Sequence, residues 1–69
     1  MGIRKIQNKI GKVLKNLRLE KNLTQEEVAF AVDISRDHLS NIENGKYPVN
    51  IKTLYKLSVF YHTEMRDFF

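Results

Sequence analysis

Two helix-start signals only eleven positions apart, at Thr24 and Ser35, constrain the fold of this chain more than any other feature. Thr24 can cap a helix, and Glu27, three residues later, completes a capping box. Ser35 can cap a second helix in the same way. The first helix therefore runs from Gln25 to about Val32, where Asp33 interrupts it. The pattern predicts two short helices joined by a turn of about three or four residues.

The second of these helices is expected from Arg36 to about Glu43, closed by the pair Asn44-Gly45. A tight connection forces the two helices to cross steeply, and the small side chain of Ala29 lets them approach. This arrangement is a helix-turn-helix, whose second helix fits the DNA major groove. The exposed face of that helix would carry four polar side chains, which are the candidate base contacts: Arg36, Asp37, Ser40 and Asn41.

The rest of the chain also has helical patterns, and no strand is expected. A long amphipathic helix is predicted to end near Lys21-Asn22, interrupted at most by Gly11. Asn50 can cap a fourth helix, and Thr63 starts a last helical turn. We therefore predict an all-α fold, a compact bundle of five helices in one domain over residues 1–69.

The positive charge is concentrated at one end of the chain. The net charge is +4 and the pI is about 9.6, which favours nucleic acid or an anionic surface as a partner. Residues 1–21 contain seven bases and one acid, whereas residues 24–45 contain one base and five acids. The basic first helix could be a solvated face, a phosphate-attracting patch or a membrane-surface helix. Its apolar stripe is needed to cover the other helices, which disfavours the membrane reading.

Several functional classes are disfavoured by the composition. The chain has no cysteine, and its two histidines, 24 positions apart, are a weak basis for a metal site. No apolar run approaches the ~20 residues of a membrane span. The basic N-terminus is not followed by the apolar segment and small-residue cleavage site of a signal peptide. No nucleophile–base pair, carboxylate dyad or phosphate-binding glycine loop is present. We expect a cytoplasmic protein that is not an enzyme and has no cofactor, metal or small-molecule ligand.

Taken together, these motifs resemble the phage-repressor-like (Cro/C1, or Xre) helix-turn-helix regulators, the family with the lambda-repressor-like DNA-binding domain. The resemblance covers roughly residues 13–69 and rests on the following segments: Leu23–Ala29 (LTQEEVA), Ile34–Lys46 (ISRDHLSNIENGK), Pro48, Ile51–Leu57 (IKTLYKL) and Met65–Phe69 (MRDFF). Two positions depart from the family pattern, because Asp33 and His62 stand where glycine is common. Both positions need a left-handed or irregular backbone, which Asp and His can tolerate.

The resemblance implies roles for individual residues. Arg18 and Glu43 match a structural ion pair, so that Glu43 would brace the core and would not face DNA. Asp37 could accept a hydrogen bond from cytosine, hold Arg36 in position, repel wrong registers on the DNA, or only favour the helix N-terminus. The expected phosphate contacts are Gln25, Ser35, Asn44, Lys46, Tyr47 and Lys52. A dimer interface is expected among the C-terminal side chains Tyr61, Met65, Phe68 and Phe69, although the two phenylalanines could instead close the core.

The implied function is a sequence-specific regulator of transcription that binds double-stranded DNA. It would act as a homodimer on a palindromic operator, as a repressor or controller, with RNA polymerase as a further possible partner. The alternative is a protein-interaction module that reuses the fold without reading DNA. The net charge of −4 over residues 24–45, one base against five acids, is the main argument for that alternative.

Overall fold

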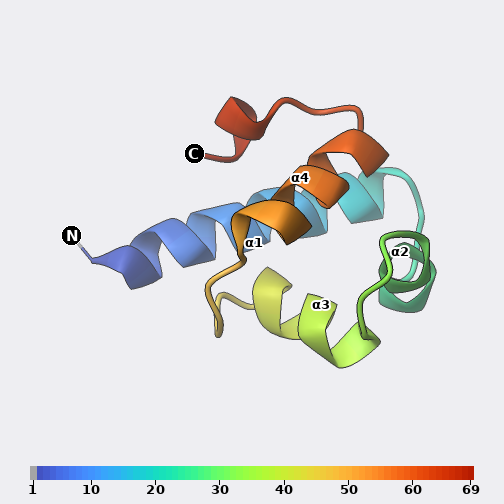
Figure 1. The fold of residues 1–69 in the computed structure, drawn as a ribbon, viewed down its shortest axis with the longest axis horizontal. Coiled ribbons are helices and arrows are strands. Elements are labelled where there is room, and N and C mark those ends of the chain that lie inside the picture. Colours follow the sequence, from blue (N-terminus) through green and yellow to red (C-terminus); the bar gives the residue numbers. More distant parts are fainter. Residues whose placement is uncertain (1) are drawn as a thin grey trace.

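The computed structural model describes residues 2–69 as a bundle of helices, with no strand in that part of the chain. Four α-helices are followed by a single turn of 3-10 helix, so the five predicted helical elements are confirmed (Figure 1). Their bounds are α1 Ile3–Glu20, α2 Gln25–Ala31, α3 Arg36–Glu43, α4 Ile51–Phe60 and η1 Met65–Phe68. Gly11 does not interrupt α1, which is continuous.

Side-chain caps fix the starts of the three central helices. Thr24 Oγ1 accepts from the Glu27 backbone N–H at 3.0 Å, and the Thr24 N–H donates to Glu27 Oε1 at 2.8 Å, which confirms the capping box. Ser35 caps α3 at 3.0 Å, and Asn50 caps α4 at 2.7 Å. These bonds satisfy N–H groups that have no partner inside the helix, so the polar residues before each helix determine where it begins.

Left-handed backbone ends the helices and makes the turns short. Asp33 has φ 61° and His62 has φ 54°, so both residues adopt the conformation expected at the positions where glycine is common. Asn22, after α1, is a third such residue with φ 57°. In the helix-turn-helix itself, the turn between α2 and α3 therefore occupies only Val32 to Ser35.

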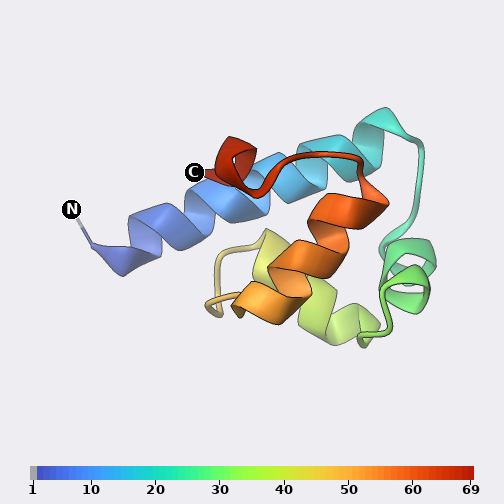
Figure 2. The ribbon, with the colours of Figure 1, turned by 45° about the horizontal axis from the view of Figure 1, so that its top comes forward.

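The core lies where α1, α3 and α4 meet, and α2 and η1 close it at two sides (Figures 1 and 2). It consists of ten aliphatic and aromatic side chains and one alanine: Ile10, Leu14, Val28, Ala29, Val32, Leu39, Ile42, Leu54, Leu57, Tyr61 and Phe68. Both views place the C-terminal turn beside the N-terminal half of α1. Phe68 is inserted from that turn into the core and is completely buried.

Gly11 allows α1 and α3 to pack closely. A Cβ atom at this position would lie 2.5 Å from the carbonyl oxygen of Glu43 and 2.6 Å from that of Ile42. Any other residue would therefore clash with backbone at the end of α3. No local sequence pattern indicates this contact, because it depends on where the two helices cross.

Candidate nucleic-acid interface

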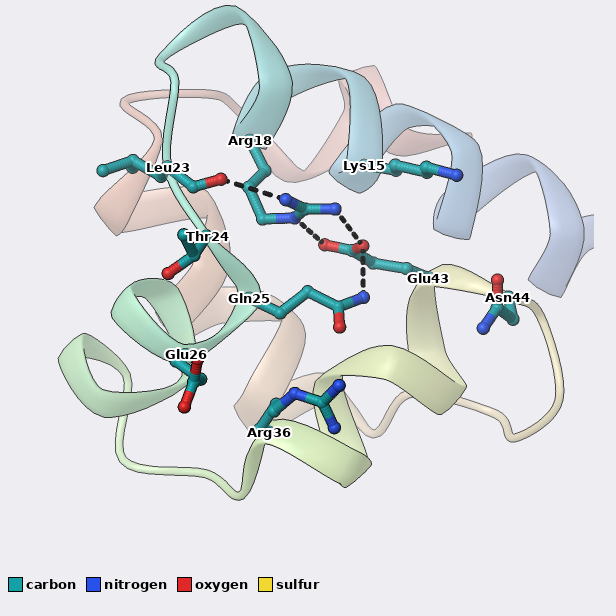
Figure 3. A pocket seen from close by; sticks show the side chains of 9 residues that line it. All are labelled: Lys15, Arg18, Leu23, Thr24, Gln25, Glu26, Arg36, Glu43 and Asn44. Atoms are coloured by element: carbon teal, nitrogen blue, oxygen red, sulfur yellow. Dashed lines mark hydrogen bonds and ion pairs between the residues drawn. The ribbon is translucent and has the colours of Figure 1, made fainter.

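A buried ion pair connects α1 to the end of α3. Arg18 Nε donates to Glu43 Oε2 at 2.9 Å, and Arg18 Nη2 donates to Glu43 Oε1 at 3.0 Å (Figure 3). This is the bidentate geometry in which an arginine binds a carboxylate most strongly. The hydrogen bonds to Glu43 raise the pKa of Arg18, against the opposing effect of burial. The expected contact is present, and Glu43 faces the core instead of the outer surface of α3.

Two further hydrogen bonds extend this ion pair into a brace that also holds the start of α2. Arg18 Nη1 donates to the carbonyl oxygen of Leu23 at 2.9 Å, and the Gln25 side-chain amide donates to Glu43 Oε1 at 3.1 Å (Figure 3). Sequence reasoning assigned Gln25 only to phosphate contact and missed this bond. Gln25 is half-buried, so its amide is fixed in direction while the residue remains partly accessible.

The outer face of α3 carries the four candidate base contacts. Arg36 and Asp37 are exposed, and Ser40 and Asn41 are half-buried. Arg36 Nη1 lies 3.2 Å from Asp37 Oδ1, so the two side chains form a surface ion pair. A pair this exposed contributes at most about 1 kcal/mol and can exchange readily for other partners. Asp37 therefore holds Arg36 in this structure without locking it.

The candidate phosphate contacts lie on both sides of α3. Gln25, at the start of α2, and Asn44, directly after α3, line one shallow recess that also includes Arg36 (Figure 3). Lys46, Tyr47 and Lys52 are exposed in the loop after α3 and at the start of α4. Ser35 is exposed as well, although its oxygen already accepts the capping hydrogen bond. The structure thus brings Gln25, Arg36 and Asn44 together at one recess, and leaves the other candidate donors exposed on the neighbouring segments.

The residues expected at a dimer interface do not form one surface, and this corrects the sequence-based expectation. Tyr61 is 3% exposed and Phe68 is completely buried, because the small bundle uses both rings to fill its core. Met65 is half-buried, and Phe69 is 56% exposed beside Lys5, Ile6 and Lys9 of α1. The larger exposed apolar stripe lies on α4 instead, at Ile51, Tyr55 and Val59.

Two other observations bear on the expected classes. No α-helix within residues 2–69 is both long enough and apolar enough to cross a membrane. The same part of the chain holds no group of three or more His, Cys, Asp or Glu side chains placed to bind a metal ion.

Comparisons with known proteins agree with this geometry. The helix-turn-helix family model matches residues 14–68. The ImmF control region 10 kDa protein of Bacillus phage phi105 is 40% identical over 57 residues, which are 83% of this chain and 63% of the phage protein, slightly less than two thirds of its length. The control protein C.MunI of a Mycoplasma species is 44% identical over 54 residues, covering 77% of this chain and 73% of that protein.

A solved structure gives the same result in three dimensions. The restriction-modification controller protein C.AhdI from Aeromonas hydrophila superposes with a TM-score of 0.85 at 32% sequence identity. The superposition covers 91% of this chain and 96% of the controller protein. With the family match over residues 14–68, this shows that the chain belongs to the Cro/C1-type helix-turn-helix family of DNA-binding transcriptional regulators, which are not enzymes.

Proposed function

We propose that this protein is a sequence-specific regulator that binds double-stranded DNA as a homodimer, with α3 in the major groove of each half of a palindromic operator. The observation that carries this proposal is the outer face of α3. It is polar and accessible, and its only acid, Asp37, is already paired with Arg36. The brace of Arg18, Glu43 and Gln25 holds this helix rigidly against α1 and α2.

The chemistry of the face supports direct base reading. Arg36 stands in the first turn of α3, from which recognition helices reach base edges, and its guanidinium can bind the O6 and N7 atoms of guanine together. Asn41 lies five residues further along and can pair with adenine in the same bidentate way. When a guanine takes the place of Asp37 as the partner of Arg36, Asp37 would release the guanidinium. Asp37 could instead accept a hydrogen bond from a neighbouring cytosine.

The flanking groups supply the attachment that does not depend on sequence. Gln25, Ser35 and Asn44 would donate to phosphates near α3, and Lys46, Tyr47 and Lys52 would do so from the following loop and the start of α4. Contacts of this kind set the register of α3 in the groove. They would also allow the chain to bind a polyanion although its central segment is acidic. Three acids of that segment, Glu26, Glu27 and Asp33, belong to α2 and the turn and not to α3.

A second copy of the chain is proposed to cover the outer face of α4. Ile51, Tyr55 and Val59 recur every four residues, so they form one stripe, and each is more than half exposed. A groove beside this stripe is lined by Tyr55, Val59 and Met65, the last of which was expected at the interface from the sequence. Two-fold pairing along this stripe would give the symmetry that a palindromic operator requires.

A dimer bound at an operator would act as a repressor or a controller. It represses where it occludes a promoter, and it activates where it contacts RNA polymerase from an adjacent site. Similarity to the ImmF control region 10 kDa protein, to the control protein C.MunI and to the restriction-modification controller protein C.AhdI supports this proposal.

The decisive experiment is the selection of bound duplexes from a random pool. We expect the recovered sequences to share an inverted repeat with half-sites about one helical turn apart. Affinity for the selected duplex should fall linearly on logarithmic axes as salt rises. A pool that shows no enrichment, together with no duplex binding at low salt, would instead favour the protein-interaction module that the exposed acids of residues 24–45 suggest.

The role of Arg36 can be tested on the selected duplex. Arg36→Ala should remove the preference at one base pair of each half-site, a loss of about 1–3 kcal/mol of discrimination. Competition among duplexes that differ only at single positions measures this directly. If all duplexes weaken equally, Arg36 contacts a phosphate. Asp37→Ala in the same assay separates reading of a neighbouring base from simple positioning of Arg36.

A further inference from the structure

One face of α1 follows α3 and continues past its end. The residues at positions 4, 8, 11, 15 and 18 recur at three- and four-residue spacing, so they share this face. Gly11 abuts the carbonyl groups of Ile42 and Glu43, and Arg18 pairs with Glu43. Asn8 is one helical turn before Gly11 and lies against Gly45. A Cβ atom on Gly45 would collide with the side-chain oxygen of Asn8. The face therefore borders the loop that follows α3.

Two of the three exposed members of this face, Arg4 and Lys15, are basic, and the third is Asn8. Arg4 and Lys15 are both exposed, and neither forms an ion pair within residues 2–69. The only acid of α1 is Glu20, in its last turn. Lys15 lines the recess that Gln25 and Asn44 also line, at the edge of the proposed phosphate contacts (Figure 3).

Arg4 extends this basic face beyond the bundle. It lies seven residues before Gly11, which is about 10 Å along the helix axis. At this distance it stands past the contact with α3 and beyond Asn8, on the side of the loop that carries Lys46. The family match begins at residue 14, so this half of α1 lies outside the region that the helix-turn-helix family model describes.

We propose that Arg4, Asn8 and Lys15 form a second phosphate clamp, which binds the sugar-phosphate backbone next to the part gripped by the loop after α3. The proposal rests on the proposed function, because its ligand is the same DNA duplex. Two cations and an amide donor spaced along one helix face suit successive phosphates of one strand. The clamp would increase affinity without changing sequence preference.

The opposite side of α1 provides a matched control. Lys5 and Lys9 are also exposed, but they flank Phe69 and Ile6 on the side where the C-terminus lies. Arg4→Gln/Lys15→Gln and Lys5→Gln/Lys9→Gln each remove two positive charges from the same helix. The two double variants therefore have equal net charge and differ only in the face of α1 from which two positive charges are removed.

The test measures dissociation constants for the selected duplex over a series of salt concentrations. The clamp variant should bind more weakly at low salt, and its slope of log affinity against log salt should be less steep by up to about 1.8, or 0.9 for each lost contact. The control variant should keep the slope of the unchanged protein. Thermal unfolding should be the same for all three proteins, since both pairs of side chains are exposed.

Each other outcome overturns the clamp. Equal slopes for the two variants would show that only the overall charge matters. If the unchanged protein binds the duplex with a steep salt dependence and neither variant alters it, the clamp is absent while the proposed function stands. If the unchanged protein binds no duplex, both fail.

Discussion

At the scale of single residues, the hydroxyl of Tyr61 is the polar group that the core satisfies least. The side chain is 3% exposed, and the hydroxyl has no hydrogen-bond partner within residues 2–69. An unpaired buried polar group costs roughly 1–3 kcal/mol. We therefore expect Tyr61→Phe to leave stability at neutral pH unchanged or to increase it by about 1 kcal/mol, as measured by chemical denaturation.

The same variant should alter the dependence of stability on alkaline pH. Burial, reinforced by the negative charge of Glu43, raises the pKa of Tyr61 from 10.0 to about 12, with Arg18 acting in the opposite direction. Between these values the unfolded tyrosine releases its proton while the folded one keeps it. Stability therefore falls as pH rises from 10 to 12, by at most about 3 kcal/mol.

Tyr61→Phe should make this decline shallower, whereas Tyr47→Phe, in an exposed loop, should leave it unchanged. The two curves of unfolding free energy against pH distinguish the cases. An identical decline in both variants would show that other groups cause the alkaline loss.

Glu43 contributes more to the free energy of unfolding than an exposed acidic side chain would. It accepts three hydrogen bonds, two from Arg18 and one from Gln25. Glu43→Ala would leave the buried guanidinium of Arg18 without its partner, so we expect a loss of about 3–5 kcal/mol in the free energy of unfolding. The double variant Arg18→Met/Glu43→Leu removes both charges and should recover much of that loss. A double variant as unstable as the single one would contradict this account.

At the scale of elements, the contact between α1 and α3 depends on the absence of a side chain at Gly11. Alanine is favoured over glycine inside a helix by about 1 kcal/mol. The new Cβ atom would nevertheless meet backbone oxygens 2.5 and 2.6 Å away, and overpacking of this kind costs about 1–3 kcal/mol. Gly11→Ala should therefore lower the unfolding temperature and move α1 away from α3.

Asn16→Ala provides the comparison for that variant. Asn16 is exposed in the same helix, so alanine should stabilise it slightly or have no effect. Thermal unfolding of both variants separates helix propensity from packing. If Gly11→Ala were as stable as Asn16→Ala, the close approach of the two helices would not limit the fold.

The elements and their starts could be predicted from the sequence because capping is local. Thr24, Ser35 and Asn50 each act on a backbone N–H group three residues away, so the signal and the structure lie in the same short window. The left-handed turn at Asp33 could be predicted from its own short polar side chain, whereas the one at His62 was expected only from the resemblance to a family. The pair of Arg18 with Glu43 spans 25 positions and was accessible only through resemblance to a family.

Other features depend on how the helices cross, which no local pattern reports. Gly11 reads as a weak point in a helix until α3 is placed against it. Tyr61 and Phe68 were both expected at a dimer interface, with the core as the alternative for Phe68, because an exposed interface and a small core both use aromatic side chains. The bundle resolves this by burying both rings, which leaves the stripe on α4 as the exposed apolar surface.

At the scale of the whole molecule, function as proposed requires two copies of the chain. Tyr55→Ser/Val59→Ser places hydroxyl groups in the stripe on α4 and should produce monomers in analytical ultracentrifugation. Both side chains are more than half exposed, so the fold should be retained. Leu19→Ser is the control, because Leu19 on α1 is 52% exposed, close to the 55% of Val59.

DNA binding by these variants separates the dimer from the recognition helix. When two half-sites are bound by linked modules, the second contact forms at a high effective concentration, and affinity can rise by roughly 10²–10⁴-fold. The variant with both stripe substitutions should lose about that factor on a palindromic duplex and keep its affinity for a single half-site. Leu19→Ser should keep both. If the stripe variant remains dimeric and binds the palindrome normally, the second copy docks on another surface. The α3 face of each monomer is intact in this variant, so it would still bind DNA.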